Sequence, residues 1–314
     1  MNESPSSDIL PEKTRFVLPA VLFLVTVLTT LTAGFVLHVS FVSKNLEEVG
    51  DHLTSALMHP MDLLYGFPFC FTILVILLAH EMGHYLACRY YGIKSTLPYV
   101  IPAPPPFNPF GTFGAVIRIK SNFEDRRQLF DVGIAGPIAG FLFVIPALIV
   151  GLQNSKEFVF SGPVEEILEF GEPLLFQFAA RVFYPGGAGS QISLHPVGWA
   201  AWFGMLATSI NLLPIGQLDG GHMVYALFGA RGHRIFSLGT FILLLVLSLY
   251  SWPMLGYFVF ALVLLFIGFR HPQPQSELIQ LQGRRLAIAV LALILLILTF
   301  IPVPIQLVES TGRL

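Results

Sequence analysis

The stretch Ala79-His80-Glu81-Met82-Gly83-His84 places two imidazoles and a carboxylate inside a run of otherwise apolar residues. On an α-helix, His80 and His84 project from one face because they are four positions apart, so both can bind the same metal ion. Glu81 lies about 100° around the helix from His80, which lets it reach a water held by the metal rather than the metal itself. Ionisable side chains are costly in lipid, so this cluster indicates a functional site.

The composition is typical of an integral membrane protein. Of the 314 residues, 54% are hydrophobic and only 11% are charged. Because the formal net charge is −2, no basic field covers the molecule, so we expect the lipid bilayer and not nucleic acid as a partner. The two cysteines, Cys70 and Cys88, would lie about 27 Å apart on one continuous helix and could not form a disulfide within it.

Windows of about 20 apolar residues predict seven transmembrane helices, at residues 16–39, 63–91, 129–152, 196–213, 235–250, 253–269 and 286–304. The first window is too long for a signal-peptide core of about 7–15 apolar residues, so we expect a retained anchor. The fifth and sixth windows are separated only by residues 251–252. A tight hairpin is favoured there, because one continuous helix would overshoot the bilayer.

Between the second and third predicted spans, a group of prolines excludes a continuous helix: Pro98, Pro102, Pro104, Pro105, Pro106 and Pro109. Residues 111–120 follow, and Ile117 and Ile119 alternate there with Arg118 and Lys120, which favours a strand. Two interpretations stay open, a cytoplasmic loop with a small hairpin and a re-entrant sheet beside the metal site. The expected fold is thus an all-α polytopic membrane protein of about seven helices with a small re-entrant β-hairpin.

Basic residues in the short loops predict the orientation. Six of them lie between the second and third spans: Arg89, Lys94, Arg118, Lys120, Arg126 and Arg127. By the positive-inside rule this side is cytoplasmic, which puts the N-terminus inside, most simply in a bacterial plasma membrane. The outer loop at residues 153–195 carries several Phe and Glu residues, and we expect an amphipathic surface helix in it.

A catalytic zinc site normally has three protein ligands and an open position, so a third ligand must come from elsewhere in the chain. Asp219 is the candidate, because Pro214 and Gly216 interrupt the helix before it and leave a lone carboxylate in apolar surroundings. The alternative is that Asp219 caps the helix that follows. His222 is more readily explained as a neutral buried imidazole than as a ligand, and Cys88 as a small core residue.

These motifs resemble the site-2 protease family of intramembrane zinc metalloproteases. His80-Glu81-Met82-Gly83-His84 matches the HExxH helix of that family, and Asn211, Pro214 and Asp219-Gly220 match its second signature. The small residues from Gly133 to Gly140 allow close helix contact, and Gly136-Pro137 among them is similar to a further family motif. Residues 107–115 resemble the bacterial and plastid branch. Members often carry a PDZ or CBS domain, and we expect neither here.

The resemblance implies that His80, His84 and Asp219 bind one Zn²⁺ per chain, that Glu81 is the general base, and that Asn211 assists as a hydrogen-bond donor. The implied substrates are transmembrane helices of membrane-anchored proteins, while the oligomeric state stays open. The expected organisation is a cytoplasmic tail at residues 1–15, a first helix and external loop at 16–62, a metalloprotease core at 63–229 and C-terminal helices at 230–314. The rival function is a non-hydrolytic zinc-binding membrane protein or a zinc transporter, which would not need Glu81.

Overall fold

The computed structural model describes residues 14–105, 107–157, 166–186, 192–250, 257–258, 260–262, 273–276 and 281–309. Its helices are α1 (Thr14–Val42), α2 (Leu46–Met58), the 3-10 helix η1 (Pro60–Gly66), α3 (Phe67–Tyr90), α4 (Arg126–Gln153), α5 (Leu174–Phe183), α6 (Pro196–Leu212), α7 (Asp219–Tyr250) and α9 (Arg284–Thr299). Its strands are β1 (Tyr99–Pro102), β2 (Thr112–Val116), β3 (Lys156–Glu157), β4 (Glu166–Phe170), β5 (Ile192–Ser193) and β6 (Ile305–Glu309). They form three antiparallel pairs, β1–β2, β3–β5 and β4–β6.

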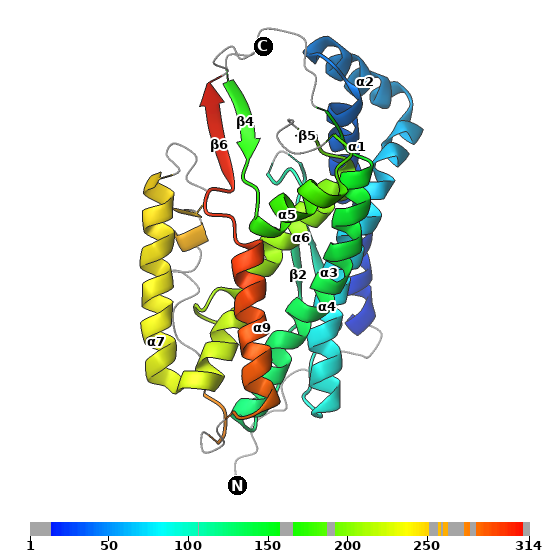
Figure 1. The fold of residues 1–314 in the computed structure, drawn as a ribbon. Helices are drawn as coiled ribbons and strands as arrows, with labels where there is room; N and C mark the ends of the chain where they lie inside the picture. The colour runs from blue at the N-terminus through cyan, green and yellow to red at the C-terminus, as the bar shows by residue number, and fades with distance from the viewer. Residues whose placement is uncertain are drawn as a thin grey trace.

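The described part of the chain is mostly helical, and α1, α3, α4 and α9 run along a common direction (Figure 1). Four helical segments within it are long and apolar enough to cross a bilayer: Phe16–Val42, Pro60–Tyr90, Arg126–Gln153 and Asp219–Leu249. The protein is therefore an integral membrane protein with a small two-stranded sheet between its second and third spans.

The other predicted spans look different in the structure. The fourth is α6, which has 17 residues, and the seventh is α9, which has 16, so each is shorter than the roughly 20 residues of an upright crossing. The seventh ends early because the chain turns extended at Phe300 and then forms β6 against β4. The sixth, at 253–269, and the hairpin expected before it lie mostly outside the described residues.

The fifth predicted span, at 235–250, belongs to a longer element. Helix α7 begins at Asp219 and is interrupted at Gly229, which has φ 71° and ψ −171°. A positive φ is accessible to glycine at little cost, so the chain can change direction there. The part of α7 that follows Gly229 stands beside the bundle at the left of Figure 1.

Helices α3 and α4 pack closely because both carry glycine at their contact. A Cβ added to Gly83 of α3 would lie 2.3 Å from the backbone oxygen of Ala135 in α4. Such a distance leaves no space for any side chain, so the two backbones approach as small residues permit. The close contact predicted for the segment from Gly133 to Gly140 is thereby confirmed.

The predicted hairpin is present, but its second strand is shorter than expected. Strand β2 pairs with β1 only as far as Val116, because β1 provides just four partner residues. Beyond Val116 the pairing continues irregularly: Thr96 N–H donates to the Arg118 carbonyl at 3.0 Å, and Lys120 N–H donates to the Lys94 carbonyl at 2.7 Å. The alternating apolar and basic residues at 117–120 thus lie in an irregularly paired extension of the hairpin.

Threonines of α1 hold this hairpin. Thr29 Oγ1 donates to the Gly111 carbonyl at 2.6 Å, and Thr26 Oγ1 donates to the Val100 carbonyl at 3.2 Å. A Cβ on Gly111 would meet the Thr29 backbone oxygen at 2.4 Å, so only glycine permits this approach. The first span carries no sequence motif, yet it holds the hairpin that lies beside α3.

An ion pair joins α9 to the core. Arg285 at the start of α9 donates to both carboxylate oxygens of Asp131 in α4, at 2.9 and 2.7 Å, and Tyr91 after α3 donates to the same carboxylate. Sequence analysis assigned no partner to Asp131, because the contact joins residues 154 positions apart.

The outer loop contains the expected helix. Helix α5 buries Phe176 and Ala179 and lies across the same end of the bundle as the β4–β6 pair (Figure 1). Its exposed face carries the charged Arg181 but also the apolar Phe178 and Val182, so the helix is less clearly amphipathic than expected.

Candidate metal centre

Helix α3 presents His80 and His84 together, as their spacing predicted. The two Nε2 atoms lie 3.1 Å apart, and each side chain is about 90% removed from solvent, with a relative exposure of 9%. The helix is continuous from Phe67 to Tyr90, so both imidazoles have a rigid support.

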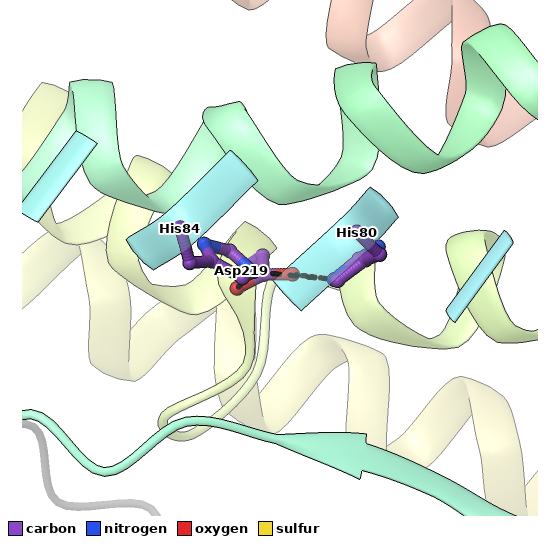
Figure 2. A group of neighbouring side chains, drawn as sticks. All are labelled: His80, His84 and Asp219. Atoms are coloured by element: carbon purple, nitrogen blue, oxygen red, sulfur yellow. Dashed lines mark hydrogen bonds and ion pairs between the residues drawn. The ribbon is translucent and has the colours of Figure 1, made fainter. Parts of the chain in front are cut away.

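The carboxylate of Asp219 follows directly after the break between α6 and α7. Asp219 is the first residue of α7, and its Oδ2 lies 3.2 Å from His80 Nε2 while its Oδ1 lies 3.3 Å from His84 Nε2. Figure 2 shows the carboxylate between the two imidazoles. Both oxygens of Asp219 therefore face the histidines, which is the arrangement of a shared ligand set and not of a helix cap alone.

The spacing of these donor atoms fits one tetrahedral metal ion. Donors at about 2.0–2.1 Å from a tetrahedral zinc lie roughly 3.3 Å from one another. The three separations here are 3.1, 3.2 and 3.3 Å. Within the described residues, His80, His84 and Asp219 form the one group of three donors close enough to hold an ion, and two imidazoles with a carboxylate are a zinc-type donor set.

A backbone carbonyl of α4 orients one of the imidazoles. His84 Nδ1 lies 2.7 Å from the carbonyl oxygen of Val132, a distance that requires Nδ1 to carry the proton. With Nδ1 protonated, Nε2 of the neutral ring keeps its lone pair for a metal. Sequence analysis missed Val132, because the interaction uses the main chain and no side-chain pattern reveals it.

Two glycines of α4 provide the space for the rings. A Cβ on Gly136 would lie 2.1 Å from His84 Nε2, and a Cβ on Gly140 would lie 3.0 Å from the Cβ of His80. The small-residue stripe thus does more than allow helix packing, since it forms the wall against which the imidazoles lie.

Glu81 faces a different neighbour. Its side chain is buried, with the residue 7% exposed, and the backbone of Ile117 forms a hydrogen bond with its carboxylate. The carboxylate is also close enough to His84 and Asp219 to interact with both electrostatically. Glu81 is therefore next to the donor group without belonging to it, and the hairpin extension beyond β2 contacts it directly.

Asn211 approaches the site from the end of α6. Its Nδ2 lies 3.2 Å from His80 Nε2, which sets an amide donor beside the three donor atoms. The structure thus brings together all five residues that the sequence analysis selected: His80, Glu81, His84, Asn211 and Asp219.

The weaker candidates lie outside this group. Cys88 is fully buried on α3, one turn beyond His84. His222 is half-buried one turn beyond Asp219, where its ring lies 6.2 Å from that of Phe123. His195, which was not among the candidates, caps α6, since its Nδ1 accepts from Val197 N–H at 3.2 Å.

Comparison with known proteins agrees with this geometry. The family model described as Peptidase family M50 matches residues 68–249. The chain is 33% identical over 242 residues to the Arabidopsis thaliana protein named "Probable zinc metalloprotease EGY1, chloroplastic", an alignment that covers 73% of this chain and 43% of the relative. The Oryza sativa subsp. japonica protein of the same name is 31% identical over 243 residues, covering 73% and 41%, and the Arabidopsis thaliana protein named "Probable zinc metalloprotease EGY2, chloroplastic" is 31% identical over 200 residues, covering 63% and 35%.

The fold and the site together define the class of protein: a helical membrane protein that buries a His-His-Asp group beside a glutamate. The chain belongs to Peptidase family M50, the site-2 protease family. It spans less than half the length of the curated relatives that it matches.

Proposed function

We propose that the protein is an intramembrane zinc metalloprotease that hydrolyses peptide bonds within transmembrane helices of membrane-anchored proteins. His80, His84 and Asp219 bind one zinc ion per chain, Glu81 is the general base and Asn211 is a hydrogen-bond donor to the reacting carbonyl. The observation that carries the proposal is the convergence of three donor atoms from two helices to within 3.3 Å, with a buried carboxylate alongside.

Zinc bound there would polarise the scissile carbonyl and activate a water molecule for attack. Glu81 accepts the proton released by that water and passes it to the departing amine nitrogen. The hydrogen bond from Ile117 holds the Glu81 carboxylate toward this position, while the Val132 carbonyl keeps His84 in the required tautomer. Asn211 Nδ2 stabilises the negative charge that develops on the carbonyl oxygen.

A substrate helix must unwind before its peptide bond can react, because helical carbonyls are already hydrogen-bonded. We propose that the β1–β2 hairpin receives the unwound segment by main-chain pairing. The exposed apolar side chains of Phe113 and Val116 on β2 support this role, since they suit contact with an apolar substrate. The hairpin also leads directly into Ile117, which contacts Glu81.

The rival function, a zinc transporter or other non-hydrolytic zinc-binding protein, is not favoured. Such a protein needs metal ligands but no buried carboxylate next to the first histidine. A transporter also needs a series of polar sites across the membrane, whereas the described residues contain a single group of three donors.

We further propose that the four candidate spans, α6, α9 and the segment at 253–269 together make seven membrane crossings. For the domain organisation we propose a tail at 1–15, a first helix and loop at 16–62, a core at 63–229 and C-terminal helices at 230–314. The basic loop between the second and third spans supports an N-terminus on the cytoplasmic side, and a bacterial plasma membrane stays a prediction because the matched relatives are named as chloroplastic.

This orientation predicts the side from which loop residues can be labelled. In intact cells, a membrane-impermeant maleimide should react with Lys44→Cys and should react with Lys120→Cys only after permeabilisation. The native Cys70 and Cys88 are buried, so they give little background. The reverse labelling pattern would invert the proposed topology.

Two variants test the proposed zinc ligands and the proposed general base independently of each other. Asp219→Ala should lose zinc together with activity, because two imidazoles leave the ion under-ligated. Glu81→Gln should keep stoichiometric zinc and lose turnover by roughly 100-fold or more, because only the base is removed. Metal content is measured by mass spectrometry of the purified chain, and turnover with a transmembrane peptide substrate.

Cys88→Ala is the matched control, since Cys88 is buried on α3 but lies outside the donor group. It should retain both zinc and turnover. Stoichiometric zinc in purified Asp219→Ala would remove Asp219 from the ligand set, and substantial cleavage by Glu81→Gln would remove Glu81 from the mechanism.

A further inference from the structure

The loop between α6 and α7 connects two residues of the site. Asn211 is near the end of α6 and Asp219 begins α7, so residues 213–218 determine how the amide and the carboxylate lie relative to one another. The middle of this loop is buried: Ile215 has no exposed surface, and the buried Gly216 has φ 58°, a conformation that favours glycine. Non-helical backbone in an apolar interior needs partners for its N–H and C=O groups.

Two side chains from a later part of the chain provide these partners at Gly216. His233 Nε2 lies 2.8 Å from the Gly216 carbonyl oxygen and donates to it, and Ser237 Oγ accepts from the Gly216 N–H at 3.3 Å. Both are buried, with exposures of 3% and 0%. Because they are four residues apart on one helix, they face the same way and hold both polar groups of one residue.

The interruption at Gly229 makes this contact possible. His233 and Ser237 lie in the part of α7 beyond Gly229, whereas Asp219 lies in the part before it. A straight helix would carry residue 233 about 21 Å along the axis from residue 219. The change of direction at Gly229 brings the second part back to the loop.

The first turn of α7 is packed against the same loop. A Cβ on Gly221 would lie 2.4 Å from the Gly216 carbonyl oxygen, the atom that accepts from His233. The loop is therefore held on one side by the start of α7 and on the other by His233 and Ser237. Movement of Gly216 would be transmitted to Asp219, which follows three residues later.

We propose that His233 and Ser237 are positioning residues of the metal site, which fix the loop at Gly216 and so set Asp219 and Asn211 against His80 and His84. This inference rests on the proposed function, because it treats Asp219 as a zinc ligand. It extends the functional unit beyond Gly229 into the following part of α7, which contains neither a metal donor nor a recognised motif.

The test measures zinc affinity by chelator competition on the purified full-length chain, together with the unfolding midpoint of the metal-free protein. His233→Leu removes the donor to Gly216 and should weaken zinc binding by about tenfold or more, as loss of supporting hydrogen bonds does at other metal sites. His233→Gln keeps an N–H donor and should restore most of the affinity. Rescue by the donor distinguishes positioning from simple packing of a ring.

A milder pair of variants covers the case in which His233→Leu fails to fold. Ser237→Ala should weaken zinc binding several-fold, whereas Ser248→Ala should not, because the buried Ser248 hydroxyl bonds to the Leu244 carbonyl within its own helix. Equal loss of affinity in the two serine variants would overturn the proposal. A lowered unfolding midpoint with unchanged zinc affinity in His233→Leu or Ser237→Ala would also overturn it.

Asp219→Ala in the same series separates this inference from the proposed function. If Asp219→Ala keeps zinc, the ligand set is wrong and the positioning role is refuted with it. If Asp219→Ala loses zinc while His233→Leu and Ser237→Ala bind it as the unaltered chain does, the ligand set holds and the positioning role alone is refuted. Loss of zinc in Asp219→Ala, with graded loss in the two positioning variants, is the expected result.

Discussion

Gly136 provides a sharp test of how the α3–α4 contact serves the metal site. A Cβ at this position would lie 2.1 Å from His84 Nε2 and 2.5 Å from both Cδ2 and Cε1 of the same ring. In Gly136→Ala the ring nitrogen would therefore have to move by about 1.3 Å to reach ordinary contact, whereas metal–ligand distances tolerate only roughly 0.2 Å. The variant should lose stoichiometric zinc and peptide cleavage.

The effect on folding should be smaller than the effect on zinc. Overpacking by one methyl group typically destabilises a protein by about 1–3 kcal/mol, which many helical membrane proteins survive. Zinc per chain, turnover and the unfolding midpoint are measured together in detergent. Gly239→Ala is the matched control, because a Cβ on Gly239 meets no atom within 4 Å.

Gly140→Ala provides a graded comparison, since its Cβ would lie 3.0 Å from the His80 Cβ and would demand a smaller shift. We expect it to weaken zinc binding less than Gly136→Ala. If Gly136→Ala binds zinc and cleaves substrate like Gly239→Ala, the glycine wall is not required and the argument from ring clearance is wrong.

Two further predictions concern Ile117 beside Glu81 and Asp125 at the start of α4. Ile117→Pro should reduce turnover by tenfold or more relative to Ile117→Ala at equal zinc content. Proline removes the N–H that bonds to Glu81, and the loss of such a hydrogen bond costs about 1–3 kcal/mol. Equal turnover of the two variants would show that the Ile117 N–H has no role in catalysis. Asp125 caps α4 by accepting hydrogen bonds from the N–H groups of Arg127 and Gln128. Burial by itself would raise the pKa of Asp125, but the Arg127 guanidinium and these N–H groups hold that pKa below its ordinary value. The contribution of Asp125 to stability is therefore present above about pH 4 and is lost as the pH falls below that value. The unfolding midpoint of the unaltered chain should fall further in acid than the midpoint of Asp125→Asn. Parallel pH profiles of the two proteins would contradict this prediction.

Much of the site could be predicted from the sequence because its chemistry is local. The four-residue spacing of His80 and His84 defines one face of a helix whatever surrounds it, and a helix break before Asp219 identifies an isolated carboxylate. Hydropathy likewise predicts membrane helices directly, since lipid removes most alternatives to them. These features need only neighbours in sequence.

The number and length of the spans were harder to predict, because apolar composition alone does not fix where each helix ends. Helix α6 has the composition of a span, but with 17 residues, among them the buried Ala200, Ala201 and Trp202, it is shorter than an upright crossing. The extended pair β4–β6 was also missed, because its strands are more than 130 residues apart in sequence. Pairing over such distances leaves no local pattern.

Residue identity and spacing were enough to predict the donor types, the helices that carry them and the helix break before Asp219. How the donors meet, and what holds them there, depends on tertiary contacts that the sequence does not reveal: the Val132 carbonyl on His84, the clearance at Gly136, the Ile117 contact with Glu81, and the fixation of Gly216 by His233. Each of these contacts uses backbone atoms or the absence of a side chain. Backbone N–H and C=O groups are the same in nearly every residue, and a glycine does not reveal which ring will lie against it, so these partners are settled by packing.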